Sequence, residues 1–219
     1  MAAAASAFAS SSVRAVVVIL SVVLLAAVVH ASGGEGGGGG GRAAWTALDG
    51  VCGDLGGYYV TPELCKSALC GGGVGPSSSS PCRAARGAPE VAALAARLAA
   101  ANATVTKASI EVAANVTGLQ QNRSGNGTAA AARRQGMRSC LQLYADAVPA
   151  LEWAARSVAA GRYRGAREVL QAAQYVSLGC EGMAGGGEGG GAAALPRENE
   201  RFSVMAIVAH AVVASMLGP

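Results

Sequence analysis

Residues 138–183, RSCLQLYADAVPALEWAARSVAAGRYRGAREVLQAAQYVSLGCEGM, decide the fold of this chain. Around their first half, apolar side chains recur at alternating steps of three and four: Met137, Leu141, Tyr144, Val148, Leu151, Ala155 and Val158. The pattern restarts after Gly161 at Tyr163, Ala166, Leu170 and Ala173. Such spacing places the apolar residues on one stripe of each of two helices. We expect an antiparallel helical pair joined at Gly161, because glycine takes a positive φ without a Cβ clash.

Two cysteines bracket this helical pair. In an antiparallel pair the start of one helix lies beside the end of the next, so Cys140 is expected beside Cys180. Two helices of similar length, tied at their open end, form a rigid module rather than a pocket, which favours binding over catalysis. Pro149 lies inside the first helix and lacks a backbone donor, so a kink or a break is expected there.

The N-terminal residues have the features of a secretory signal peptide. Arg14 precedes an apolar run over 15–29, and small residues stand before a cleavage point at Ser32. The run is too short and wrongly flanked for a membrane span. Residues 1–31 are therefore expected to be removed, which leaves a secreted protein without a membrane span. Residues 32–44 are mostly glycine and predict a flexible tether.

An even number of cysteines remains after this cleavage: Cys52, Cys65, Cys70, Cys82, Cys140 and Cys180. In an oxidising compartment this favours disulfides, although spacing alone does not decide the pairing. Residues 45–70 predict two short helices clipped by a Cys52–Cys65 bridge, with Thr61 and Pro62 at the start of the second helix. A bridge between Cys70 and Cys82 would close the glycine/serine loop that separates them. A metal site is not expected, because Cys-x-x-Cys is absent and His210 is the one histidine outside the signal peptide.

The same compartment fits four N-glycosylation sequons, at Asn102, Asn115, Asn122 and Asn126. Asn122 and Asn126 lie in a polar stretch, 120–134, for which we predict a loop, and they are the favoured sites. Asn102 and Asn115 flank an apolar helical stripe, where a glycan would be crowded.

The remaining periodic segments predict an all-α chain. A helix over 88–119 is expected to place these residues on one apolar face: Val91, Leu94, Leu98, Val105, Val112, Val116 and Leu119. Further helices are predicted over 137–160, 162–180 and 198–217, and no segment alternates with the period of a strand. The expected domain, 45–219, is an up-down four-helix bundle with an N-terminal helical hairpin, stapled by disulfides.

No group of residues suggests catalysis. His210 sits on an otherwise apolar helix, where a packing role is the simpler interpretation, and the carboxylates are not paired for acid–base work. Neither an enzyme nor a cofactor is expected. The formal net charge of +4 falls by one when Arg14 is removed, which does not indicate a nucleic-acid partner. Trp153 lies nearly opposite the apolar stripe of its helix, beside Arg156. It either packs under the N-terminal hairpin or a kinked neighbouring helix, or forms a hot spot for a protein partner.

The order of these features resembles the plant invertase/pectin methylesterase inhibitor family. The matching residues are Val51-Cys52, Thr61-Pro62-Glu63-Leu64-Cys65 and Leu69, then Cys140, Tyr144, Ala147-Val148, Leu151, Gly161-Arg162-Tyr163, Ala166, Leu170, Ala172-Ala173 and Cys180-Glu181-Gly182, and finally Ala209-His210-Ala211-Val212. The resemblance implies a secreted four-helix bundle with an N-terminal hairpin and two disulfides, which docks on a cell-wall enzyme. The separation of Cys140 and Cys180 fits the second of these bridges, whereas Cys70 and Cys82 are additional. His210 stands where asparagine is usual.

The resemblance implies a monomeric inhibitor of pectin methylesterase in the apoplast, which fills the carbohydrate cleft of its partner sterically. Near the surface that the family uses on its target, Gln171, Gln174 and Tyr175 replace residues of a usual Ser-Ala-Ala-Leu-Thr run. An acid invertase is the alternative partner on the same scaffold. A second alternative is a non-inhibitory cell-wall glycoprotein in which 203–217 is a lipid-anchor signal, although the helical spacing of this segment argues against it.

Overall fold

The computed structural model describes residues 46–71, 81–124, 127–184 and 195–218, and every regular element in these ranges is a helix. Short helices come first: α2 (Ala47–Gly53), the 3₁₀-helix η1 (Asp54–Tyr58), α3 (Pro62–Cys70) and α4 (Pro81–Ala84). Four longer helices follow: α5 (Ala88–Ser124), α6 (Thr128–Ala159), α7 (Tyr163–Ala184) and α8 (Arg197–Ser215). The signal peptide and most of the tether predicted from the sequence lie outside the described residues.

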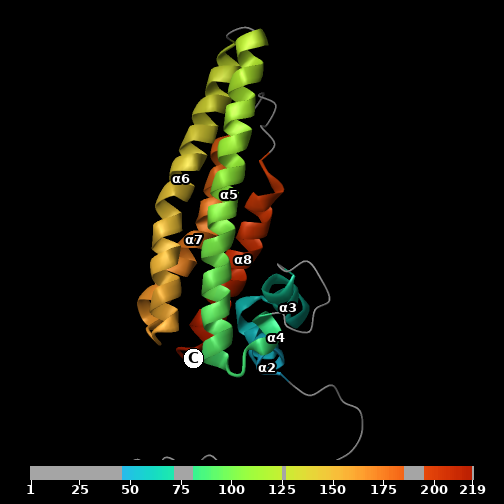
Figure 1. Cartoon of the computed structure of the whole chain (residues 1–219), viewed down its shortest axis with the longest axis vertical. Coiled ribbons are helices and arrows are strands. Elements are labelled where there is room, and N and C mark those ends of the chain that lie inside the picture. The colour runs from blue at the N-terminus through green and yellow to red at the C-terminus, as the bar shows by residue number, and fades with distance from the viewer. Residues whose placement is uncertain (1–45, 72–80, 125–126, 185–194, 219) are drawn as a thin grey trace, which may run out of the picture. The chain divides into compact units, whose positions relative to one another are not determined.

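The four long helices form an up-down bundle (Figure 1). α5 packs against α6 and α8, and α7 packs against the same two helices. Each inner face repeats every three to four residues, as the buried residues of α7 illustrate: Ala166, Leu170, Ala173, Ser177, Cys180 and Ala184. On the axis of the bundle, the rings of Tyr144 and Phe202 meet edge to face, with their centroids 5.2 Å apart. The predicted all-α class is confirmed.

The N-terminal hairpin, which we define as α2, η1 and α3, packs on α5 and α8 (Figure 1). Thr46 and Asp49 cap α2 reciprocally, since the Asp49 amide donates to Thr46 Oγ1 and the Thr46 amide donates to the Asp49 carboxylate. Lys66 of α3 pairs with Asp49 at 2.6 Å. The hydrogen bonds from Lys66 and Thr46 hold the pKa of Asp49 well below its usual range. Local capping and one ion pair therefore fix the two helices of the hairpin relative to each other.

Disulfides join successive elements of the chain. The bonded pairs are Cys52–Cys65 between α2 and α3, Cys70–Cys82 between α3 and α4, and Cys140–Cys180 between α6 and α7. A cross-link of this kind restricts the unfolded chain and typically contributes about 2–4 kcal/mol. Two of the bonds therefore stabilise the small N-terminal elements, and the third ties together the two helices that the opening stretch of sequence predicts.

The turn between α6 and α7 requires a glycine. Gly161 has a φ of 73°, a left-handed conformation that side chains with a Cβ rarely adopt. The Gly161 amide donates to Val158 O at 2.9 Å, and the Arg162 amide donates to Ser157 O at 2.8 Å, which is the Schellman pattern. The last carbonyls of α6 are thereby satisfied, and the chain reverses in three residues, as the sequence predicts.

The connection between α5 and α6 is shorter than predicted. The sequence favours a polar loop over 120–134, whereas α5 continues to Ser124 and α6 already begins at Thr128. Four successive alanines, 129–132, favour helix strongly enough to outweigh the polar composition around them. α6 also continues through Pro149, so the helix is not split there. Pro149 is exposed, so water can compensate the hydrogen bond that proline cannot donate to the Ala145 carbonyl.

The valine face predicted for α5 is not the face that packs inside the bundle. Val105, Val112 and Val116 are 57%, 63% and 48% exposed. The buried residues along the middle of α5 are mostly small: Ala92, Ala95, Ala96, Ala99, Ala103, Thr106 and Ile110. Alanine permits a closer approach of helix axes than valine does, so α6 and α8 pack on the alanine face. The valine face is covered only near its start, where Val91 and Leu94 are buried and the hairpin packs on α5.

Asn199 of α8 lies at the centre of a buried polar junction with α6 and α7. Its Oδ1 accepts a hydrogen bond from Tyr144 Oη at 2.7 Å. Its Nδ2 donates to Glu181 Oε1 at 3.1 Å and to the Ser177 carbonyl at 3.4 Å. Burial, together with the charge of Glu181, raises the pKa of Tyr144 well above its usual range, so the phenol remains a donor at any physiological pH. We refer to Tyr144, Ser177, Glu181 and Asn199 as the polar junction.

We expect Tyr144→Phe to lower the free energy of unfolding by about 1–3 kcal/mol, because it leaves the buried Asn199 Oδ1 without its donor. Denaturant unfolding of the oxidised protein measures the loss. Tyr163→Phe is the matched control, since Tyr163 is a half-buried tyrosine of α7 outside the polar junction, and its loss should stay within about 0.5 kcal/mol. Equal losses in the two variants would contradict this account of the junction.

We expect Gly136→Ala to destabilise the bundle by about 1–3 kcal/mol through overpacking. A Cβ at Gly136 of α6 would collide with the Met183 carbonyl oxygen and lie 3.3 Å from Ala184 Cα, both backbone atoms of α7. Gly50→Ala in α2 is the control, because a Cβ there meets nothing within 4 Å and alanine is the better helix former by about 1 kcal/mol. The midpoint temperature of thermal unfolding should fall for Gly136→Ala and should not fall for Gly50→Ala. A more stable Gly136→Ala protein would show that α6 and α7 do not approach closely at this glycine.

Candidate functional site

The outer side of α7 presents a row of exposed side chains, which we call the α7 ridge: Arg164, Glu168, Gln171, Tyr175 and Leu178. Successive members are four and three residues apart, so they share one face of the helix. The opposite face of α7 is buried in the bundle, so the ridge points outward. Tyr175 and Leu178 are 66% and 57% exposed, which places two large apolar groups on this surface. Gln174, the third α7 residue proposed from the sequence, is half-buried at the side of the ridge.

Trp153 of α6 packs against α7 and not under the N-terminal hairpin. A Cβ built on Gly165 would lie 3.0 Å from Trp153 Cη2, so the absence of a side chain at Gly165 makes room for the indole. The indole keeps 45% of its surface exposed. Arg156 is also exposed, one helical turn further along α6. The structure therefore places Trp153 beside the start of the α7 ridge, whereas Gln171 and Tyr175 lie about two turns further along α7.

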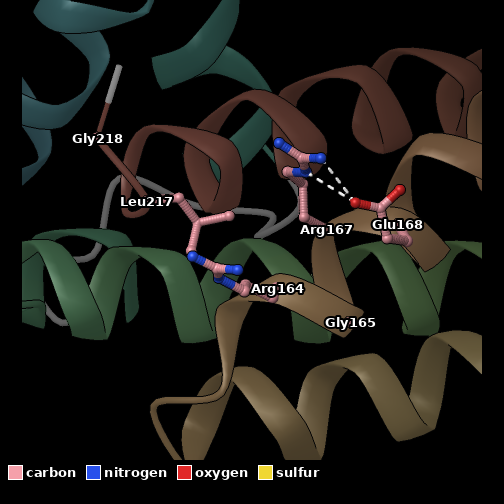
Figure 2. Close-up of a pocket in the computed structure, with 6 residues that line it drawn as sticks. All are labelled: Arg164, Gly165, Arg167, Glu168, Leu217 and Gly218. Carbon is pink, nitrogen blue, oxygen red and sulfur yellow. Dashed lines mark hydrogen bonds and ion pairs between the residues drawn. The ribbon is translucent and has the colours of Figure 1, made fainter.

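A hollow of about 390 Å³ lies at the start of the α7 ridge (Figure 2). Its lining residues are Arg164, Gly165, Arg167 and Glu168 of α7, with Leu217 and Gly218 after α8. The Arg167 guanidinium donates to the Glu168 carboxylate at 2.6 Å, while Arg164 extends toward Leu217. The six lining residues include one carboxylate, Glu168, which is paired with Arg167, and no side chain that could serve as a nucleophile beside it. No local sequence pattern predicts this hollow, because it joins residues some fifty positions apart that only the packing of α8 beside α7 brings together.

His210 lies half-buried on α8, next to the hollow and the hairpin. Its ring is perpendicular to that of Tyr58 of η1, with the centroids 6.3 Å apart and the planes at 90°. Burial lowers the pKa of His210, the positive charge of Arg167 lowers it further, and the charge of Glu168 opposes this shift. Within the ranges that the structure describes, no group of three or more histidine, cysteine or acidic side chains could hold a metal ion.

The sequons fall in or next to α5. Asn102 is half-buried, and its Nδ2 donates to Leu98 O at 2.8 Å, so a glycan would be crowded there as expected. Asn115 is exposed, which differs from the crowding expected at that position. Asn122 belongs to the last turns of α5 and not to a loop, and Asn126 lies outside the described residues. Glycosylation of all four remains a prediction.

The last helix belongs to the core of the bundle. Ten of the 19 residues of α8 are buried, including Phe202, Met205, Val208 and Val212. The segment proposed as an alternative lipid-anchor signal, 203–217, is therefore largely packed against α5 and α7. Of the helices that the structure describes, none combines the length and the apolar character that a membrane crossing requires.

Fold and surface together define a disulfide-tied helical bundle with an exposed ridge on α7 and the half-exposed Trp153 beside it. Residues 47–212 match the family model described as plant invertase/pectin methylesterase inhibitor, and the chain belongs to this family. Its members are inhibitors and not enzymes, and they are typically secreted. No curated protein and no solved structure matches the chain.

Proposed function

We propose that this protein is a secreted, monomeric inhibitor of pectin methylesterase in the apoplast, which acts by inserting the α7 ridge and Trp153 into the carbohydrate cleft of the enzyme. Inhibition would be steric and non-covalent. Membership of the inhibitor family supports the class of partner, and the exposed ridge supports the mode of binding. Trp153, Arg156, Gln171, Gln174 and Tyr175 are the proposed contacts.

The shape of the α7 ridge carries this proposal. From Arg164 to Leu178 it spans about 21 Å at 1.5 Å per residue, and it is straight and convex because it lies on one helix. An enzyme that acts on a polysaccharide needs a long open cleft for several sugar units, whereas an enzyme that acts on a disaccharide needs only a short pocket. A ridge of this length complements a cleft better than a pocket, which favours pectin methylesterase over acid invertase.

Rigidity of the α7 ridge supports the same conclusion. The Cys140–Cys180 bond and the polar junction fix α7 to α6 and α8 close to Tyr175 and Leu178. A surface held in this way loses little conformational entropy on binding, so more of the contact energy appears as affinity. Trp and Tyr are enriched among the residues that dominate protein interfaces, and Trp153 and Tyr175 are suitably exposed.

Purified oxidised protein, secreted from a eukaryotic host, is expected to lower the activity of at least one plant pectin methylesterase when the two are mixed in equal amounts. The assay covers a panel of pectin methylesterases and of acid invertases between pH 5 and 7. Inhibition of an invertase alone would replace the proposed target by the alternative one. Activity unchanged across both panels would overturn the proposed function.

Tyr175→Ala and Trp153→Ala should each weaken inhibition of the responding enzyme at least tenfold, which corresponds to about 1.4 kcal/mol of binding free energy. Tyr59→Ala is the matched control, because Tyr59 is a 97% exposed tyrosine next to η1 that is not among the proposed contacts. Inhibition constants and circular dichroism are compared for all three variants. A loss confined to Tyr59→Ala would place the contact surface on the hairpin.

A further inference from the structure

His210 occupies the contact between the N-terminal hairpin and the bundle. The elements packed against α8 are α5, α7, α3 and η1. His210 is half-buried among them, and Tyr58 of η1 stands perpendicular to its ring. The hairpin is cross-linked internally by Cys52–Cys65, so α2, η1 and α3 are bound to move together. The proposed function makes no use of this contact.

The charges around His210 disfavour a second positive charge. Arg167 and Glu168 of α7 are the charged groups that act on it, and within the described residues η1, α3 and α5 add no other. The Glu168 carboxylate is already bonded to the Arg167 guanidinium at 2.6 Å and is exposed, so it compensates only part of the repulsion from Arg167. A proton on the imidazole would therefore be less hydrated than in water and would lie near a guanidinium.

We propose that His210 is a pH-sensitive contact that secures the N-terminal hairpin on the bundle while the imidazole is neutral and loosens the hairpin when the imidazole is protonated. Opening of the hairpin lets water reach His210, so the open form holds the proton more tightly than the closed form. By linkage, acid then shifts the equilibrium toward the open form. The disulfides keep the hairpin itself intact, so protonation changes only how tightly the hairpin is held on the bundle.

The direction of the pH dependence follows from the lowered pKa of His210 in the closed form. Docking is strongest above the pKa of the open form, where both forms are neutral. This pKa does not exceed the ordinary histidine value of about 6.5, because α7 keeps Arg167 beside His210 when the hairpin opens. As the pH falls below the pKa of the open form, that form takes up a proton first and docking weakens, by at most tenfold in the equilibrium constant per pH unit. Docking stops weakening once the pH is below the pKa of the closed form, because both forms are then protonated.

Hydrogen exchange of the intact oxidised protein, read by mass spectrometry between pH 7.5 and 4.5, tests the proposal. After correction for the intrinsic exchange rate, the protection of the α2, η1 and α3 amides should fall severalfold below pH 6.5, while that of α6 and α7 changes less. His210→Asn keeps a polar side chain without a proton to bind, so its hairpin protection should be independent of pH over this range. The same decline in His210→Asn as in the parent protein would overturn the proposal.

Proton NMR of the imidazole supplies a second readout that does not depend on the stability of His210→Asn. The pKa of His210, assigned by the loss of its signal in that variant, should lie below the ordinary value. Arg167→Gln removes the repelling charge and frees Glu168, so it should raise the pKa of His210. The pH at which the protection of the hairpin amides begins to fall should rise in parallel. Tyr58→Phe retains the ring and should leave both unchanged. An imidazole that titrates at or above the ordinary value, or an Arg167→Gln protein with an unmoved onset, would contradict the inference.

Discussion

The hydrogen bonds of Asn199 are the interaction on which the arrangement of the bundle depends. A buried amide without partners costs far more than a satisfied one gains, so Asn199 tolerates only the register in which Tyr144 and α7 meet it. The backbone carbonyl of the neighbouring residue, Glu198, accepts a hydrogen bond from Thr106 Oγ1 of α5 at 3.0 Å, so all four long helices are fixed at one level. Alanine is the most frequent buried residue of this core and offers little shape with which to set the register, so the polar contacts add to what the larger side chains specify.

The polar junction also fixes the orientation of the α7 ridge, which is the proposed contact surface. α7 is held at one end by the turn at Gly161 and at the other by Cys140–Cys180 and the polar junction. A helix fixed at both ends cannot rotate about its axis, so the α7 ridge faces outward along its whole length. The same constraint seats Trp153 over Gly165, because the indole needs α7 at a fixed distance and rotation. The contacts that fix both ends of α7 thus make the bundle rigid and also decide which side chains form its outer surface.

Much of the arrangement of α6 and α7 could be predicted from local sequence patterns and chain geometry. The spacing of apolar residues around Tyr144 and Leu170 predicted the α6–α7 pair, and the glycine at 161 predicted its turn, because both effects act within a few residues. The α5 face was predicted wrongly, since periodicity identifies apolar faces but not which of them a neighbour covers. Val112 and Ala99 each belong to a regular stripe, and only the close approach of α6 and α8 selects the alanines. Trp153 was recognised as unusual from its position, yet its contact with Gly165 depends on the second helix.

The sequence by itself determined the helical class, the direction of the chain through the bundle, and the family to which the protein belongs, since these follow from periodicity, turn residues and cysteine positions. Tertiary structure alone decided which residues share a surface. The contact of Trp153 with Gly165, the hollow beside Arg164 and the contact between His210 and Tyr58 all join groups from different helices. Their proximity depends on the distance and rotation between helix axes, and those quantities are fixed by side-chain packing and by the hydrogen bonds of Asn199, which no local pattern encodes.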